Sequence, residues 1–183
     1  MDVDTWWGLI ERARAQVGER ADDRDSPDDP LVNALTELLV ALEPEQIIAF
    51  KRRFGEVSGS AYRYPLWTAA ELIEGGCGDD GFMDFRAGLI LQGRTTFEWA
   101  VADPDSLAGL PVVIRMAGDE GGWIGCEAMN YAPRNAYARK LGETGSFDAA
   151  LSGPRPPRQP SGEHWTSEER TRERLPRLSA LFL

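Results

Sequence analysis

The sequence is poor in the residues that most catalytic and metal sites require. It contains a single histidine, His164, and two cysteines, Cys77 and Cys126, which lack the spacing of a metal site. This scarcity argues against a histidine-based catalytic triad and against a multi-histidine metal centre. The chain also lacks a phosphate-binding GxxxxGK[ST] loop, a dinucleotide-binding GxGxxG after a strand, and a paired CxxC. We therefore predict no cofactor, and we favour a protein that is not an enzyme.

A second absence concerns membranes and secretion. No stretch approaches the ~18 consecutive apolar residues of a membrane span. Met1 is followed by Asp2, Val3 and Asp4 rather than by a basic region and an apolar run, so we read no secretory signal. We expect a cytoplasmic protein that has no membrane partner and keeps both cysteines as thiols.

The chain also has fewer basic than acidic residues. The 183 residues include 20 basic and 30 acidic side chains, which gives a formal net charge of −10. Residues 1–150 carry a net charge of −12 and residues 151–183 a net charge of +2. Because an acidic surface repels phosphate backbones, we expect no nucleic-acid partner. A basic protein partner fits this charge better.

Apolar residues recur at helical spacing along most of the chain, which predicts an all-α protein. One clear stripe follows the cap and proline of Asp29-Pro30 and consists of Leu31, Leu35, Leu38 and Leu42. We predict a multi-helix orthogonal bundle. A short strand is possible near residues 112–116, because a run as brief as Val112-Val113-Ile114 does not distinguish a strand from a buried connection.

The predicted helices fall into a core and a C-terminal extension. We assign residues 1–150 to a helical core domain. Residues 151–183 are expected to form a Pro-rich tether and a short C-terminal helix that docks on the core. Within the core, Pro133 predicts a kink or a break in the last helix.

The stretch Tyr62–Trp99 has the strongest pattern, and we expect the fold to be organised around it. Its first helix should end at Gly75-Gly76, where the chain can adopt the left-handed conformation. Asp79-Asp80 should then cap a second helix, whose apolar stripe is Phe82, Phe85 and Leu89. We expect backbone geometry to require Gly75, Gly76 and Gly81 around this turn.

This stretch resembles a bacterial family, the domain of unknown function numbered four-two-four-zero, which has no established activity. The resemblance supports the fold and implies no catalytic residue or cofactor. It also extends to both ends of the chain. The residues that carry it are Trp6-Trp7, Leu9-Ile10, Glu11, Leu66-Trp67, Ala69-Ala70, Ile73, Gly75-Gly76-Cys77, Asp79-Asp80-Gly81-Phe82, Phe85-Arg86, Leu89-Ile90, Gln92-Gly93-Arg94, Asp103-Pro104-Asp105-Ser106-Leu107 and Leu175-Pro176-Arg177-Leu178.

The acidic turn is the main candidate site. Asp79, Asp80 and Asp84 lie close in sequence to Glu71 and Glu74 at the end of the preceding helix. Carboxylates that converge from two helices can bind a hard cation such as Mg²⁺ or Ca²⁺. Acidic residues are also the expected occupants of a helix start, and this structural role is the better interpretation.

Three arginines and one cysteine lie near this turn. Arg63, Arg86 and Arg94 either pair with the acids or with Glu98, or clamp an anionic ligand, and pairing is the better interpretation. Cys77 lies between glycines near a helix N-terminus, which are conditions that can lower a thiol pKa. No neighbouring base is visible, so a catalytic cysteine is poorly supported.

Aromatic residues suggest an interface. Trp6 and Trp7 cannot share one helix face, so either one of them points away from the core or both are wedged between helices. Together with Tyr64 and Trp67 they are candidates for exposed contact residues. The sequence thus favours a protein that binds another macromolecule through an acidic helical surface, in a regulatory, toxin-neutralising or adaptor role. The alternative is an enzyme or a small-ligand or metal-binding protein with a pocket at the Gly75–Asp84 turn.

Overall fold

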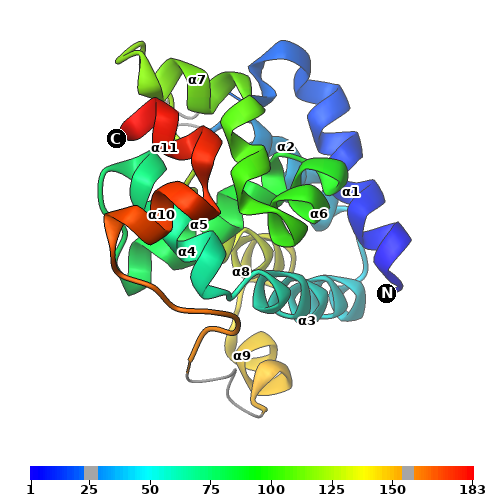
Figure 1. The fold of residues 1–183 in the computed structure, drawn as a ribbon. Helices are drawn as coiled ribbons and strands as arrows, with labels where there is room; N and C mark the ends of the chain where they lie inside the picture. The colour runs from blue at the N-terminus through cyan, green and yellow to red at the C-terminus, as the bar shows by residue number, and fades with distance from the viewer. Residues whose placement is uncertain (23–28, 154–158) are drawn as a thin grey trace.

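The computed structural model describes residues 1–22, 29–153 and 159–183, and the regular secondary structure of these residues is entirely helical (Figure 1). The predicted all-α bundle is therefore confirmed. Two 3₁₀ helices, η1 (Gly18–Asp22) and η2 (Pro104–Gly109), accompany the α-helices. The α-helices are α1 (Val3–Val17), α2 (Pro30–Val40), α3 (Pro44–Ser60), α4 (Tyr64–Glu74), α5 (Asp79–Leu91), α6 (Arg94–Ala102), α7 (Pro111–Ala117), α8 (Glu127–Leu141), α9 (Gly145–Leu151), α10 (Glu168–Arg174) and α11 (Pro176–Phe182).

The strand considered for residues 112–116 is wrong, because this segment is the helix α7. Pro111 occupies its first turn, where a proline has the right φ and its missing N–H is not needed. Val112 and Val113 are buried in the core, and this packing overrides the preference of valine for strands. None of the described helices is long and apolar enough to cross a membrane.

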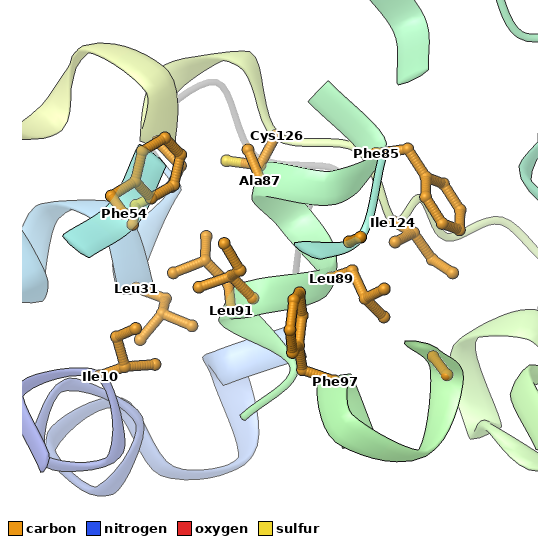
Figure 2. Packing of buried hydrophobic residues seen from close by; sticks show 14 of the residues in the cluster. Ile10, Leu31, Phe54, Phe85, Ala87, Leu89, Leu91, Phe97, Ile124 and Cys126 are labelled. Atoms are coloured by element: carbon orange, nitrogen blue, oxygen red, sulfur yellow. The ribbon is translucent and has the colours of Figure 1, made fainter. Parts of the chain in front are cut away.

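The helix α5 runs through the centre of the hydrophobic core. Every residue from Ala87 to Leu91 is buried, which no helix at the surface of a bundle would allow. Figure 2 shows side chains from α1, α2, α5 and α6 gathered in one cluster around this helix. The stretch expected to organise the fold, Tyr62–Trp99, thus contains the central helix.

The segment that leads into α8 crosses α5 at very close range. The amide of Cys126 donates a hydrogen bond to the carbonyl oxygen of Asp84, at 2.9 Å. One turn further along α5, a Cβ added to Gly88 would lie only 1.7 Å from the carbonyl oxygen of Ile124. The absence of a side chain at Gly88 is what lets the two backbones meet.

The predicted break at Pro133 does not occur, because α8 continues through this residue. Proline cannot donate a backbone hydrogen bond, so the turn before it loses one helical bond. Near this turn, the Nζ atom of Lys51 donates to the carbonyl oxygen of Asn130 at 2.9 Å. Lys51 therefore ties α3 to α8 where the proline weakens the helix.

At one end of the bundle, away from α7 and α11, α9 packs on α3 and, through the rings of Phe147 and Tyr137, on α8 (Figure 1). Its buried residue, Phe147, forms a small separate cluster with Ile47 and Tyr137. The predicted boundary near residue 150 falls within α9, and the division into core and extension stays a prediction.

The C-terminal residues contain two short helices, α10 and α11, rather than the single helix expected. Leu175 and Leu178 are buried in the main core. Residues 154–158 of the predicted tether lie outside the described residues. Beyond them, Ser161 pairs with the backbone on both sides of Arg63, accepting from Tyr64 N at 2.9 Å and donating to Tyr62 O at 3.0 Å.

Candidate functional site

The turn between α4 and α5 has the predicted glycine exit but a different helix start. Gly75 ends α4 in the left-handed conformation, with φ 67°, as expected. The cap of α5 is Gly78, and Asp79 and Asp80 lie inside the first turn, where neither makes a capping hydrogen bond. The prediction that one of them caps the helix is therefore wrong. Their charge still lies next to the free amides of the helix start, where it is favourable.

Gly81 does not have the special backbone conformation that the sequence suggested. It lies within α5 and is absent from the glycines with positive φ. A Cβ at this position would meet the Sγ atom of Cys77 at 3.5 Å, which is an ordinary contact. Backbone geometry therefore requires glycine at Gly75 and Gly76, but not at Gly81.

Asp84 is separated from the two exposed aspartates of the turn. Its carboxylate is half-buried and accepts a hydrogen bond from Asn130 Nδ2 at 2.8 Å. Burial and the negative charge of Glu127 raise the pKa of Asp84, while the bond from Asn130 lowers it. Among the described residues, no group of three or more His, Cys, Asp or Glu side chains is arranged to hold a metal ion.

Glu74, at the end of α4, has the most strongly shifted carboxyl of the turn. Its Oε1 atom accepts a hydrogen bond from the amide of Gly125 at 3.0 Å. Burial raises the pKa of Glu74 to about 7, and the charge of Asp84 contributes in the same direction. A carboxyl with this pKa exchanges its proton near neutral pH.

The surroundings of Cys77 disfavour the reactive thiolate form. Burial, together with the charges of Glu74, Glu71 and Asp84, raises the pKa of Cys77 to about 12. The expectation of a lowered pKa is therefore wrong, because burial and the neighbouring carboxylates outweigh the helix start. The backbone carbonyl of Cys77 accepts a hydrogen bond from Trp67 Nε1 at 2.6 Å, which ties the turn to α4.

The three candidate arginines have structural partners, but among the described residues only Arg94 forms the predicted ion pair, and Arg63 and Arg86 donate to backbone carbonyls instead. Arg94 pairs with Glu98, as predicted, and also with Asp4, both at 2.7 Å. Arg86 points inward, donates to Ser58 O at 3.0 Å, and lies over the rings of Tyr62 and Phe82. Arg94 thus joins α6 to α1, and Arg86 joins α5 to α3.

Both N-terminal tryptophans are buried, so the interpretation that they fill the space between helices holds and the exposed one is wrong. Trp6 is 0% and Trp7 is 4% exposed, and their rings meet edge to face at 4.8 Å. Trp67 is half-buried and stacks on Phe82 at 4.8 Å. Tyr64 lies against His164, with ring centroids 4.3 Å apart. The large aromatic residues that are exposed are instead Trp99, Trp123 and Tyr131.

Two of the predicted residues meet in a groove between α1, α3 and α6. The groove has a volume of about 420 Å³, and both Trp7 and Arg63 line it. The guanidinium of Arg63 donates to the carbonyl oxygen of Val101 at 2.9 Å, so this side chain forms part of the wall. The other lining residues are Val3, Val57, Ser60, Phe97, Glu98, Val101 and Ala102.

Sequence reasoning did not single out these apolar lining residues. The signal that could have found them is the i, i+4 spacing of Val3 with Trp7 and of Phe97 with Val101, which places each pair on one helix face. Such pairs also occur throughout the core, and only the packing of the three helices separates groove residues from core residues.

Comparison with known families matches residues 1–139 to the model described as "Protein of unknown function (DUF4240)". The chain belongs to the DUF4240 family. The match covers the acidic turn and the groove, but it ends before Leu175–Leu178, so the resemblance inferred for those residues lies outside it. Searches of curated proteins and of solved structures gave no significant match.

Proposed function

We propose that the protein acts by binding another protein, in a regulatory, toxin-neutralising or adaptor role, and that the groove between α1, α3 and α6 receives the partner. The groove is the observation that carries this proposal. Its walls are mostly apolar, with Ser60, Arg63 and Glu98 as the polar lining residues. Clefts of this composition and size accept apolar side chains and use a few polar groups for orientation.

The charge around the groove indicates the kind of partner. Glu98 and Asp4 are exposed and share one cation, Arg94. The guanidinium of Arg63 donates a hydrogen bond to the backbone carbonyl of Val101. Residues 1–150 carry a net charge of −12. A partner segment with apolar residues on one side and basic residues on the other matches both the groove and this charge.

Site-specific crosslinking tests the location. A photoreactive amino acid at Val3, which lines the groove, should capture one defined partner in cells that express the protein natively. The same amino acid at Asn135, an exposed residue of α8, serves as the control. If both positions capture the same set of proteins, the groove is not the binding surface.

A matched pair of variants then tests whether the captured protein occupies the groove. Ala102 lines the groove and Ala128 lies on α8, and both are exposed, so each position can accept a larger residue without disturbing the core. Ala102→Trp should fill the groove and weaken binding at least about tenfold. Ala128→Trp should leave the affinity within about twofold. Equal effects of the two variants would count against the proposal.

The alternative of a metal or small-ligand site at the Gly75–Asp84 turn has weaker support. Asp79 and Asp80 are exposed, whereas Asp84 is bonded to Asn130, so the three carboxylates do not form one ligand set. Thermal-shift measurements with divalent metals, nucleotides and phosphorylated metabolites test this alternative, because a ligand that binds only the folded protein raises its stability.

A further inference from the structure

A second cavity, shallow and open to solvent, lies between the end of α4, α7 and the segment that leads into α8. Its volume is about 290 Å³, and it shares no lining residue with the groove. Its walls combine apolar, aromatic and acidic side chains. The lining residues are Ile73, Glu74, Met116, Asp119, Gly121, Gly122 and Trp123.

The carboxylate of Glu74 has no cationic partner in the described part of the chain. Its hydrogen bond comes from the amide of Gly125, and none of the ion pairs among the described residues includes Glu74. Asp119 adds a second carboxylate to the lining. Asp84 is a further negative charge, close enough to raise the pKa of Glu74, whereas the guanidinium of Arg86 is turned towards α3. Above the pKa of Glu74, which is about 7, the described residues therefore leave the negative charge of this cavity without a countercharge.

The aromatic wall is held against this carboxylate by a glycine. A Cβ added to Gly125 would lie 2.8 Å from the indole Nε1 of Trp123 and 3.2 Å from Glu74 Oε1. The edge of the indole that carries Nε1 and the carboxylate therefore both lie beside Gly125, and any larger residue there would push them apart. Trp123 remains 43% exposed, so part of its ring is free to contact a ligand.

The loop that carries Trp123 is packed firmly onto α7. Gly122 has a φ of 109°, and a Cβ at this position would lie 3.0 Å from a methyl group of Val112. A side chain at Gly122 would thus be disfavoured both by the backbone conformation and by contact with α7. This packing fixes the aromatic wall relative to Met116 on the same helix.

We propose that this cavity binds an organic ammonium cation, with its charge next to Glu74 and Asp119 and its carbon atoms against Trp123 and Met116. An indole attracts a cation through the negative face of its ring, and a carboxylate adds a charge-assisted hydrogen bond. The volume suits a small amine or a single lysine side chain better than a large metabolite. This site is independent of the proposed groove, and either can fail without the other.

Calorimetric titration with defined probes tests the ligand class. At about pH 8.5, where Glu74 is mostly ionised, we expect n-butylammonium and tetramethylammonium to bind with a Kd in the millimolar range or tighter. We expect 1-butanol, which has the size of n-butylammonium but no charge, to bind at least about tenfold more weakly. N-acetyl-lysine N′-methylamide distinguishes the sources. Tighter binding of this probe assigns the site to a lysine of a protein, and tighter binding of n-butylammonium assigns it to a free amine. Equal binding of 1-butanol, or no binding of any cation, overturns the proposal.

Variants test the residues. Glu74→Gln keeps an acceptor for Gly125 and removes the charge, and Trp123→Leu removes the ring, so each should weaken n-butylammonium binding about tenfold. Asp79→Asn removes one exposed charge outside the cavity and should change the affinity by less than about twofold. An equal loss in Asp79→Asn would mean that only the overall charge attracts the amine. If Trp123→Leu does not fold, Trp123→Phe, which keeps a weaker aromatic face, should give an intermediate affinity, and unchanged affinity would overturn the role of the ring.

Discussion

The carboxylate of Asp105 caps the start of α11 from a helix more than seventy residues earlier in the chain. Its Oδ1 atom lies 2.9 Å from the amide nitrogen of Leu178, and both carboxylate oxygens lie 3.1 Å from the amide nitrogen of Arg177. The residue at the cap position of α11 itself, Leu175, has no side-chain acceptor. Asp105 therefore satisfies amides that α11 would otherwise leave unpaired.

Replacement of this carboxylate should loosen the C-terminal helix. Asp105→Ala leaves buried amides without an acceptor and should lower the free energy of unfolding by about 1–3 kcal/mol. Hydrogen exchange of the amides in α11 should accelerate, while the amides of α5 should be less affected. Asp105→Asn keeps one acceptor oxygen and should give a smaller change. Unchanged exchange in α11 after Asp105→Ala would contradict the capping role.

The left-handed conformation of Gly75 predicts a specific order of stabilities at the acidic turn. Gly75→Ala should lower the free energy of unfolding by about 1 kcal/mol or more, because alanine is strained at positive φ. Gly81→Ala should instead raise it by up to about 1 kcal/mol, since Gly81 is an ordinary helical residue. Asp79→Asn should change it by less than about 1 kcal/mol, through the lost charge at the helix start. Urea unfolding gives all three values, and a larger loss for Asp79→Asn than for Gly75→Ala would show that the carboxylate charge itself is required.

The shifted pKa of Glu74 makes stability depend on pH. The folded protein keeps this proton up to about pH 7, whereas an unperturbed glutamate releases it near 4.5. The contribution of Glu74 is therefore fully present below pH 4.5, declines as the pH rises, and is lost above about pH 7. Glu74→Gln should be more stable than the parent protein by about 1–3 kcal/mol at pH 8, and nearly equal to it at pH 4.

Thermal or urea unfolding of both proteins across this pH range measures the difference directly. The carboxyls of Asp84 and Glu71 also have raised pKa values, but both proteins contain them, so most of their contribution cancels. A stability difference that does not change between pH 4 and pH 8 would be inconsistent with the raised pKa of Glu74.

The raised pKa of Cys77 predicts that its thiol reacts slowly with alkylating reagents. Because the thiolate is the reactive form, iodoacetamide should modify Cys77 in the folded protein at least about tenfold more slowly than in the urea-unfolded chain. Glu74→Gln removes one of the charges that raise this pKa and should speed the reaction. Mass spectrometry of the labelled peptides follows Cys77 and Cys126 separately. Rapid labelling of Cys77 in the folded protein would restore the hypothesis of an activated cysteine.

Local features of the fold were predictable because they depend on neighbouring residues. Asp29 caps a helix where the sequence placed one, with a side-chain oxygen that accepts from amides two and three residues later. Asp2 and Ser167 cap α1 and α10 in the same local way. Gly75 ends α4 for the same kind of local reason. The helical periodicity that defines the bundle is likewise contained within single segments.

The candidate site was less predictable, because its properties come from residues far along the chain. Asp84 accepts a hydrogen bond from a residue 46 positions away, and Glu74 accepts one from a residue 51 positions away. Both partners, Asn130 and Gly125, belong to a region whose path across α5 no local pattern reveals. The burial of Trp7 was equally hard to predict, because it depends on how α3 and α6 pack against α1.

The six tryptophans occupy environments that give the protein natural optical labels. Trp6 and Trp7 are almost fully buried, whereas Trp99 is 65% and Trp123 is 43% exposed. A neutral fluorescence quencher in the solvent should therefore reach the last two and leave the N-terminal pair bright. Because the cavity beside Trp123 is acidic, the ratio of caesium to iodide quenching should be higher for Trp123 than for free tryptophan. The N-terminal indoles then report on folding, while Trp123 reports on the charge of its surroundings.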